Sequence, residues 1–339
     1  MRGQRVNITI KDIAEKAHVS YATVSRALNG KYGVKPDTRA RILAISEKLN
    51  YRPNAIARGL VKNQTHTLGL VIPDITNPFF PEVARGIEDG AQEAGYSLFL
   101  CNTNWEEDKE ALYLSLLQEK RVDGIVIAPI TDQRRALEQA LSPRLPLVYV
   151  SRAPQDTRRS FVVIDNVRGG FLATEHLIRQ GYQSIGFIGA PGGSLSIDER
   201  LEGYKSAFAQ YGLRVEERVV LFGNFKRETG YNLIRRLIAD SEMPRAVFAE
   251  NDLLALGVIQ GAREAGLSVP GDLAVIGFDD IPFASFPEVQ LSTIAQPKYE
   301  MGKTAVELLI AAIEEGSQPG VAVQQIFLEP ELIVRRSSA

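Results

Sequence analysis

One short segment, residues 20–29, carries side chains suited to reading DNA bases. It contains a single arginine, Arg26, and several short hydroxyl side chains. An arginine on an exposed helix face can contact guanine through two hydrogen bonds in the major groove, and Ser or Thr hydroxyls can bond to any base. The alternative interpretation is an ordinary polar helix face. The helical spacing of the apolar residues leaves one face exposed, made of Tyr21, Ala22, Thr23, Ser25 and Arg26.

The distribution of charge favours the first interpretation. Residues 1–64 hold 13 Lys or Arg against 4 Asp or Glu, a net charge of +9, whereas the remaining residues hold 26 against 37, a net charge of −11. The excess therefore covers a whole folding unit and reverses sign beyond it. This asymmetry indicates a polyanion-binding domain joined to an acidic body.

Several other kinds of chemistry find no support. Cys101 is the only cysteine, and the three histidines, His18, His66 and His176, lack metal-ligand spacing. Residues 189–193 are glycine-rich but contain neither a Walker lysine nor a dinucleotide fingerprint. We therefore expect no metal, no cofactor and no catalytic site. No run of about 18 apolar residues and no amino-terminal apolar run occurs, so we also expect no membrane span, no signal peptide and a cytoplasmic location.

The elements that position the first segment are three short helices within residues 7–50. Thr9 is a good N-cap for the first helix, and Ser20 caps the second after a tight turn at His18. Asn29 and the glycine after it end the second helix, and the third follows Pro36. Two short helices around a tight turn, braced by a third, are the helix-turn-helix plan.

The helical domain ends at Pro53, because proline disfavours a helical conformation in the residue before it. Residues 55–61 are long enough for two helical turns, which are marginally stable alone in water. Gly59 weakens such a helix further, by about 1 kcal/mol. Residues 62–65 form a polar linker.

From Thr67 onward, short apolar strands alternate with amphipathic helices, which indicates doubly wound parallel sheets of the α/β class. More than ten such strands predict two sheets rather than one. The strand candidates include residues 68–72, 97–101, 124–128, 147–150, 185–188, 246–249 and 273–278. The helix candidates include residues 80–94, 109–119, 169–180, 200–211, 228–238 and 252–265.

At this point the chain resembles the LacI/GalR family of bacterial transcriptional repressors over nearly its full length. The amino-terminal resemblance rests on residues 10–14 (IKDIA), 19–29 (VSYATVSRALN) and 49–55 (LNYRPNA). The remainder is similar through residues 74–80 (DITNPFF), 122–125 (VDGI), 251–252 (ND) and 277–280 (GFDD). The resemblance implies a helix-turn-helix headpiece followed by a sensor similar to periplasmic sugar-binding proteins.

The resemblance also assigns roles to individual residues. It implies a hinge helix over residues 54–61 that orders on operator DNA, with a leucine, here Leu60, wedged into the minor groove. The implied DNA-contacting residues are Thr9, Ser20, Tyr21, Ala22, Thr23, Ser25, Arg26, Asn29, Asn54, Ala57, Arg58 and Leu60.

In the sensor, the resemblance implies a ligand cleft between two lobes. Arg200 and Asp279 would make charge-assisted hydrogen bonds to the ligand, and Phe79 and Phe225 would stack on a ring. We expect Arg200 and Asp279 at the ends of a helix and a strand, and so to be needed for the response to ligand but not for folding. The aromatic residues have core packing as an alternative, and Asp279 has helix capping. Trp105 is a weaker candidate. The implied effector-contacting residues are Phe79, Phe80, Asp165, Ser196, Arg200, Phe225, Asn251 and Asp279.

These observations predict three parts: a helix-turn-helix domain over residues 1–53, a hinge and linker over 54–66, and a sensor over 67–339. The first lobe would hold about 67–163 and 295–325, and the second about 164–294 and 326–339. The function implied is an effector-controlled repressor that binds a pseudo-palindromic operator as a homodimer. The effector expected first is a sugar or sugar phosphate, with a nucleobase or a protein partner as alternatives. The rival classes are a solute-binding transport protein and an enzyme on the same scaffold.

The hinge yields a first prediction. Leu60→Ala removes the apolar wedge, so it should weaken operator binding strongly and leave effector binding and dimerisation intact. Amide hydrogen exchange over residues 54–61, with and without operator, measures the ordering directly. Amides that are already protected in the free protein would show a static helix and refute this mechanism.

Overall fold

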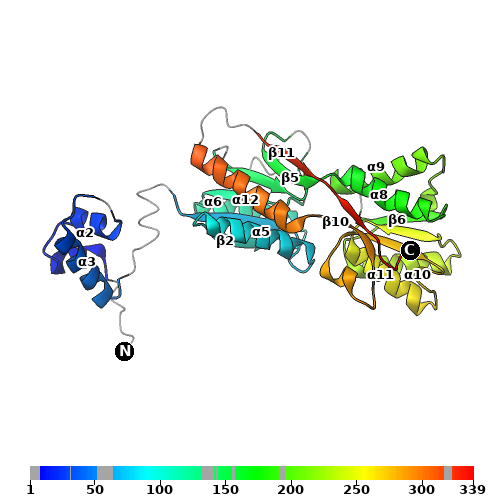
Figure 1. Ribbon diagram of the computed structural model, residues 1–339, viewed down its shortest axis with the longest axis horizontal. Coiled ribbons are helices and arrows are strands. Elements are labelled where there is room, and N and C mark those ends of the chain that lie inside the picture. The colour runs from blue at the N-terminus through cyan, green and yellow to red at the C-terminus, as the bar shows by residue number, and fades with distance from the viewer. Residues whose placement is uncertain are drawn as a thin grey trace. The chain divides into compact units, whose positions relative to one another are not determined.

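The computed structural model describes residues 8–30, 32–51, 64–130, 141–142, 144–154, 157–190, 195–316 and 323–339. The chain divides into two compact units, residues 1–65 and 66–339 (Figure 1). The smaller unit is helical, and the larger alternates strands with helices. Within the described ranges, no helix is both long and apolar enough to cross a membrane.

Three helices form the smaller unit, which we call the headpiece. α1 (Ile10–Lys16) and α2 (Tyr21–Leu28) are joined by a turn in which His18 has a φ of 50°, and α3 (Pro36–Lys48) packs against both. No side chain caps α3, and Pro36 at its first position suits the helix without one because its φ is preset. The arrangement is a helix-turn-helix, as the spacing of caps and apolar residues predicts. Its buried core consists of Ile13, Ala14, Ala17, Val24, Ala27 and Ile42.

The larger unit contains two lobes, each built on a six-stranded sheet. In the first lobe the strand order is β11-β5-β4-β3-β1-β2, and all neighbouring pairs are parallel. Helix α12 packs against β3, β4 and β5, and α6 packs against β1. The elements are β1 (Thr67–Ile72), α5 (Phe79–Glu93), β2 (Ser97–Asn102), α6 (Glu107–Glu119), β3 (Gly124–Ile127), β4 (Leu147–Val150), β5 (Ser160–Ile164), α12 (Lys298–Glu315) and β11 (Gln325–Leu328).

The second lobe has the strand order β12-β10-β9-β8-β6-β7. Only the pair β10–β12 is antiparallel, so this sheet is also doubly wound. The elements are α8 (Asn166–Arg179), β6 (Ile185–Gly189), α9 (Leu195–Gln210), η1 (Glu217–Val219), β7 (Val220–Phe222), α10 (Arg227–Ala239), β8 (Ala246–Ala249), α11 (Asp252–Glu264), β9 (Ala274–Asp279), η2 (Pro282–Ser285), β10 (Ser292–Ala295) and β12 (Glu331–Ile333).

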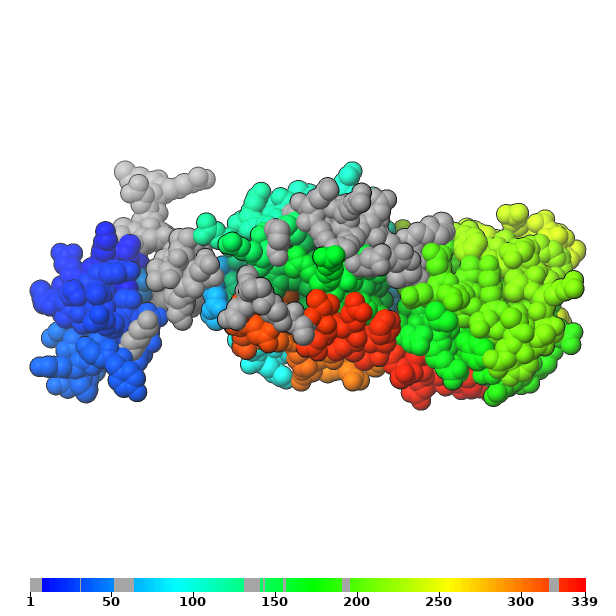
Figure 2. Space-filling view, turned by 90° about the horizontal axis from the view of Figure 1, so that it is seen from above, coloured from blue at the N-terminus to red at the C-terminus, as the bar shows by residue number. Residues whose placement is uncertain are grey.

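The chain crosses between the lobes three times, within residues 164–166, 295–298 and 328–331. The third crossing corrects the expected boundary at residue 325. Strand β11 pairs with β5 of the first lobe, so residues 326–328 belong to that lobe and not to the second. In Figures 1 and 2 the red carboxyl-terminal segment runs from the first lobe to the second. Three separate connections therefore join the two lobes.

The two helices α8 and α9 approach each other so closely that only glycine fits at their crossing. A Cβ atom on Gly170 of α8 would lie 2.2 Å from the carbonyl oxygen of Arg200, and one on Gly203 of α9 would lie 2.1 Å from that of Val167. Such distances are far inside van der Waals contact. The backbones of α8 and α9 therefore touch directly, and this contact places the side chain of Arg200 near the start of α8.

Candidate functional site

The exposed face of α2 is the first candidate site. Val24 and Ala27 turn into the headpiece core, whereas Tyr21 keeps 54% of its surface exposed. Arg26 is exposed and makes no hydrogen bond or ion pair with any described residue. Its guanidinium group is therefore free to contact another molecule. On the same helix Ala22 is exposed, and Thr23 and Ser25 are half-buried.

Three of the predicted DNA-contacting residues define helix ends. The hydroxyl oxygen of Ser20 accepts a hydrogen bond from the Thr23 N–H at 3.2 Å, which caps α2. The Asn29 side-chain amide donates to the Ser25 carbonyl oxygen at 2.8 Å, and the Asp12 carboxylate accepts from the Thr9 N–H at 2.6 Å. These bonds fix where the helices begin and end. Asn54, Ala57, Arg58 and Leu60 lie outside the described residues.

A cleft between the lobes is the second candidate site. Its lining comes from the carboxyl ends of strands in both sheets, where ligands bind in open α/β folds. Seven of the eight predicted effector-contacting residues lie together there. The lining residues are Asn77, Phe79, Phe80, Trp105, Ser151, Arg152, Ser196, Ile197, Arg200, Phe225, Glu250, Asn251, Asp279 and Gln296.

Asp165 is the exception, and its expected place at the cleft is wrong. Its carboxylate accepts a hydrogen bond from the Arg168 N–H at 2.8 Å and caps α8. The next residue, Asn166, points toward Glu199 instead and lines a neighbouring cavity. The one-residue shift follows from helix geometry, since the residue that caps a helix turns its side chain back onto the first turn.

Two stacked aromatic rings, one from each lobe, line the cleft. Trp105 follows β2 in the first lobe, and Phe225 follows β7 in the second. Their ring centroids are 4.1 Å apart with an angle of 14° between the planes, which is a stacked arrangement. The guanidinium carbon of Arg152 lies 5.1 Å from the Trp105 ring and 5.8 Å from the Phe225 ring. Trp105 therefore has a more prominent place than its sequence context predicts.

Phe79 and Phe80 serve the core as well as the cleft. Both are almost fully buried in the main hydrophobic cluster of the larger unit. Their rings meet edge to face, with centroids 5.0 Å apart. The core-packing alternative thus holds for this pair in addition to their position at the cleft wall.

Arg200 lies inside the fold rather than at a helix end. Helix α9 begins at Leu195, five residues before the expected start, so Arg200 is in its second turn and is buried. Its Nε donates to the Asn166 Oδ1 at 2.9 Å, and its Nη1 donates to the Glu250 carbonyl oxygen at 2.6 Å. Its guanidinium carbon is 3.7 Å from the centroid of Phe278. The expected position of Arg200 at a helix end is therefore wrong, and its buried hydrogen bonds give it contacts within the fold as well as at the cleft.

Asp279 is the last residue of β9 and is buried against the cleft with a φ of 109°. Its Oδ1 accepts a hydrogen bond from the Gln296 Nε2 at 2.7 Å, and it caps no helix. Burial raises the pKa of Asp279 to about 6, while Arg200 and Lys298 act in the opposite direction. At neutral pH and above, the cleft thus presents a carboxylate that can accept hydrogen bonds from a ligand.

Five further polar residues of the cleft are not among the residues expected to contact the effector: Asn77, Ser151, Arg152, Glu250 and Gln296. A usable signal existed for Glu250, because Glu250, Asn251 and Asp252 are three polar residues directly after the buried strand β8. Asn251 caps α11 by accepting from the Leu254 N–H at 2.8 Å. Across the described residues, no cluster of three or more His, Cys, Asp or Glu side chains is suited to a metal ion.

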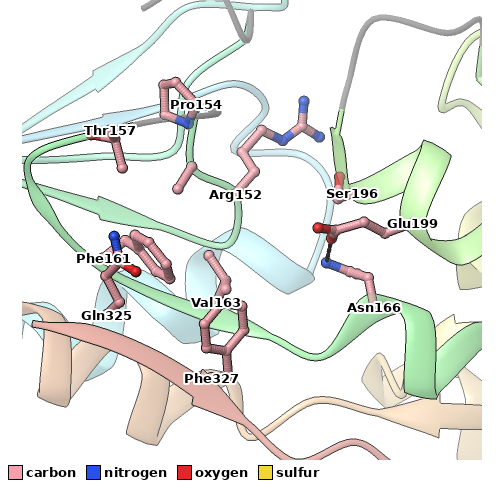
Figure 3. A pocket seen from close by; sticks show the side chains of 11 residues that line it. Arg152, Pro154, Thr157, Phe161, Val163, Asn166, Ser196, Glu199, Gln325 and Phe327 are labelled. Atoms are coloured by element: carbon pink, nitrogen blue, oxygen red, sulfur yellow. Dashed lines mark hydrogen bonds between the residues drawn. The ribbon is translucent and has the colours of Figure 1, made fainter.

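A larger cavity of about 290 Å³ adjoins the cleft, with Arg152 and Ser196 lining both spaces. Figure 3 shows Asn166 and Glu199 on one side of it, joined by a hydrogen bond of 3.0 Å, and Phe161 and Phe327 below. The cleft itself has only about 30 Å³ of free space. The cavity has more room and a mixed lining of polar and apolar residues, whereas the cleft brings together four ionisable side chains from both lobes: Arg152, Arg200, Glu250 and Asp279. We therefore assign recognition of a polar molecule to the cleft.

Comparison with known proteins covers both parts of the chain. Residues 9–54 match the model of "Bacterial regulatory proteins, lacI family", and residues 174–338 match that of "Periplasmic binding protein-like domain". The ribose operon repressor of Escherichia coli (strain K12) is 39% identical over 332 residues, which are 97% of this chain and 99% of that protein.

Two solved structures extend the comparison. The lac repressor dimer bound to operator and an anti-inducer has a TM-score of 0.87 at 26% identity, over 98% of this chain and 99% of that one. A LacI family regulator from Enterococcus faecium with bound ribose has a TM-score of 0.73 at 33% identity, over 80% of this chain and 98% of that one. Because the similarity joins a helix-turn-helix with an exposed reading face to a two-lobed unit with a polar cleft, the chain belongs to the lacI family of bacterial regulatory proteins.

Proposed function

We propose that this protein is a transcriptional repressor that binds operator DNA as a homodimer and responds to a sugar bound in the cleft between its lobes. The observation that carries the proposal is the union of two sites in one chain. The headpiece segment has a net charge of +9. Its helix α2 exposes Arg26, which makes no hydrogen bond or ion pair with another described residue. The larger unit gathers charged and aromatic side chains at one cleft. Neither an enzyme nor a transport protein needs the first site. We place its action in the cytoplasm.

The chemistry of the cleft supports a sugar. Two arginines provide hydrogen-bond donors, and two buried carboxyl groups provide acceptors. This combination suits a ligand rich in hydroxyl groups, which both donate and accept. The aromatic pair provides faces for stacking on a ring. The similar regulators named for ribose, or holding it, support the same choice. A nucleobase is the alternative that the aromatic pair alone would favour.

The first lobe has an exposed apolar surface on β2 and α6 that a second copy of the chain can cover. Strand β2 is an edge strand of the first sheet, and its Phe99 and Leu100 are exposed, as are Leu112 and Leu116 of the neighbouring helix α6. Exposed apolar edge strands are uncommon unless another chain covers them. The similarity to a lac repressor that is a dimer on its operator supports a dimer. A two-fold dimer then places one α2 in each half-site of a pseudo-palindromic operator.

Arg26 provides a test of base reading. Arg26→Ala should lose about 1–3 kcal/mol of affinity for the operator and little for a scrambled duplex, because a base contact is sequence-specific. Fluorescence anisotropy on both duplexes measures the difference. Arg41→Ala is the matched control, since it removes the same charge from the exposed side of α3. An equal loss on both duplexes for Arg26→Ala would show that Arg26 contacts only phosphate.

Asp279 provides a clearer test of effector recognition than Arg200, because the buried Arg200 also makes hydrogen bonds within the second lobe. Asp279→Asn keeps a residue type that tolerates a positive φ. It should retain operator binding and lose about 1.5–3 kcal/mol of effector affinity for each charged hydrogen bond. Asp280→Asn is the control, because Asp280 pairs with Arg335 at 2.8 Å and does not line the cleft. Equal effector affinity in both variants and the wild type would place the site elsewhere.

Trp105 is the only tryptophan of the chain, so its fluorescence reports on the cleft. The free space of about 30 Å³ holds about two water molecules, so the cleft must widen to admit a sugar, and we expect it to do so by separating Trp105 from Phe225. Titration with D-ribose, D-glucose and D-fructose should therefore shift the tryptophan emission for the sugar that binds. A Trp105→Phe variant should show no such signal. Calorimetric binding without any emission change would contradict this position for the ligand.

A further inference from the structure

Glu250 is an unusual residue for the wall of a ligand cleft. It follows β8 directly, lines the cleft and has 0% of its surface exposed. Neither oxygen of its carboxyl group has a hydrogen-bond partner among the described residues. Buried polar groups in proteins are nearly always hydrogen-bonded, and one left without a partner destabilises the fold. Its position therefore calls for an explanation other than stability.

The charged groups around Glu250 make no hydrogen bond to its carboxyl group. Arg200 reaches the backbone carbonyl oxygen of Glu250 from α9, at 2.6 Å, and not its carboxyl group. Arg152, after β4, lies over the rings of Trp105 and Phe225. Asp279 approaches from β9 with a charge of the same sign. In the described part of the chain no ion pair joins Glu250 to either arginine.

Burial, with a smaller contribution from the charge of Asp279, raises the pKa of Glu250 to about 7 against the lowering effects of Arg200 and Arg152. The backbone N–H of Ala190 also lowers this pKa, although it is not placed for a hydrogen bond to either carboxyl oxygen. The group therefore changes between its neutral and its ionised form near neutral pH. A ligand that donates hydrogen bonds to it stabilises the ionised form and lowers this pKa.

We propose that the Glu250 carboxylate accepts hydrogen bonds from hydroxyl groups of the effector and selects a neutral polyhydroxy ligand over its phosphate ester. The inference rests on the proposed function, because it assumes that the cleft binds a sugar. Four ionisable side chains line the cleft: Arg152, Arg200, Glu250 and Asp279. With both acids ionised, the charges of these four side chains cancel, so the lining carries no net positive charge for a phosphate. Lys298 lies beside Asp279, but it does not line the cleft and its Nζ donates to the carbonyl oxygens of Asp279 and Asp280. Placing a phosphate beside two carboxylates is a like-charge contact that opposes binding.

Isothermal titration calorimetry tests the proposal on the full-length protein. The probes are D-ribose, D-glucose and D-fructose, each beside its phosphate ester, at pH 6 and pH 8. The wild type should bind one neutral sugar at least about tenfold more tightly than the ester. Its affinity should rise by about tenfold from pH 6 to pH 8, because a group with a pKa of about 7 goes from about one tenth to about nine tenths ionised.

Glu250→Gln keeps the shape of the side chain and removes its charge. This variant should bind the neutral sugar about tenfold more weakly at pH 8 and discriminate less against the ester. Its pH dependence should fall to the roughly twofold change that Asp279, with a pKa of about 6, contributes between pH 6 and pH 8. Glu110→Gln is the matched control. Burial also raises the pKa of Glu110 to about 7, but Glu110 does not line the cleft, so this variant should behave as the wild type does.

Thermal unfolding separates a binding role from a structural one. A carboxyl group whose folded pKa is raised lowers stability as pH rises from its unfolded pKa to its folded pKa, here from about 4.5 to about 7. Glu250→Gln should therefore have a higher Tm than the wild type at pH 8 and a similar Tm at pH 4. A lower Tm at both values would mark Glu250 as a structural residue and overturn the proposal.

The remaining outcomes test the role of Glu250 separately from the proposed sugar effector. If the wild type binds a neutral sugar and Glu250→Gln binds it equally well with the same pH dependence, the role of Glu250 is wrong and the proposed function stands. A preference of the wild type for the ester would overturn the selectivity. If none of the six probes binds to the wild type, the proposed sugar effector is wrong and the assignment of Glu250 falls with it.

Discussion

The guanidinium group of Arg200 is the interaction on which the cleft depends. It is buried, and a buried arginine is tolerated only when its donors are matched by acceptors and its charge is balanced nearby. Asn166 at the start of α8 and the backbone of Glu250 after β8 supply the acceptors, and the ring of Phe278 in β9 covers its face. One side chain therefore fixes three strand and helix ends of the second lobe relative to one another. The polar wall of the cleft is arranged around this group.

That arrangement requires the glycines of the helix pair α8–α9. Arg200 reaches Asn166 because the backbones of the two helices touch, and they touch because Gly170 and Gly203 have no side chains to hold them apart. An alanine at either position would push its Cβ into a carbonyl oxygen of the other helix. The spacing of two helices on the outside of the sheet is thus coupled to the position of a charged group in the cleft. Backbone packing and site geometry are parts of one constraint here.

The sequence predicts most of the central strands and the exposed edge strand β2, but it misses the buried strands β5 and β10 and the three other edge strands. Strands such as β8 and β9 are continuous apolar runs, and the predicted ranges agree with the structure to within a residue or two. Strands β7, β11 and β12 lie at sheet edges and are half-exposed, so they lack such a run and were not singled out. This is also why the third crossing between the lobes was placed too early.

The sequence likewise predicts which residues reach the cleft better than it predicts their hydrogen-bond partners. Residue types at strand ends indicate which side chains reach the cleft, and seven of eight expected residues lie there. What they bond to depends on neighbours that are distant in sequence. Asp165 and Asn166 differ by one position, yet one caps α8 and the other meets Arg200 from α9. Trp105 gains its place only because Phe225, 120 positions later, is brought opposite to it. Pairing across the lobes is information that no local pattern contains.

The contents of the cleft also determine what an effector must do there. The two lobes are linked by the three connecting segments and, in the cleft, by the Trp105–Phe225 stack with Arg152 over it. A ligand that separates these rings gives up their mutual contact, which is worth about 0.5–1.5 kcal/mol for an aromatic pair. The ligand recovers this free energy by stacking on the same rings and by donating hydrogen bonds to the buried carboxyl groups. The observed affinity is the difference between these contributions. A ligand can bias the relative position of the lobes only through contacts that differ between the two arrangements, and the ring pair that we expect to separate is such a contact.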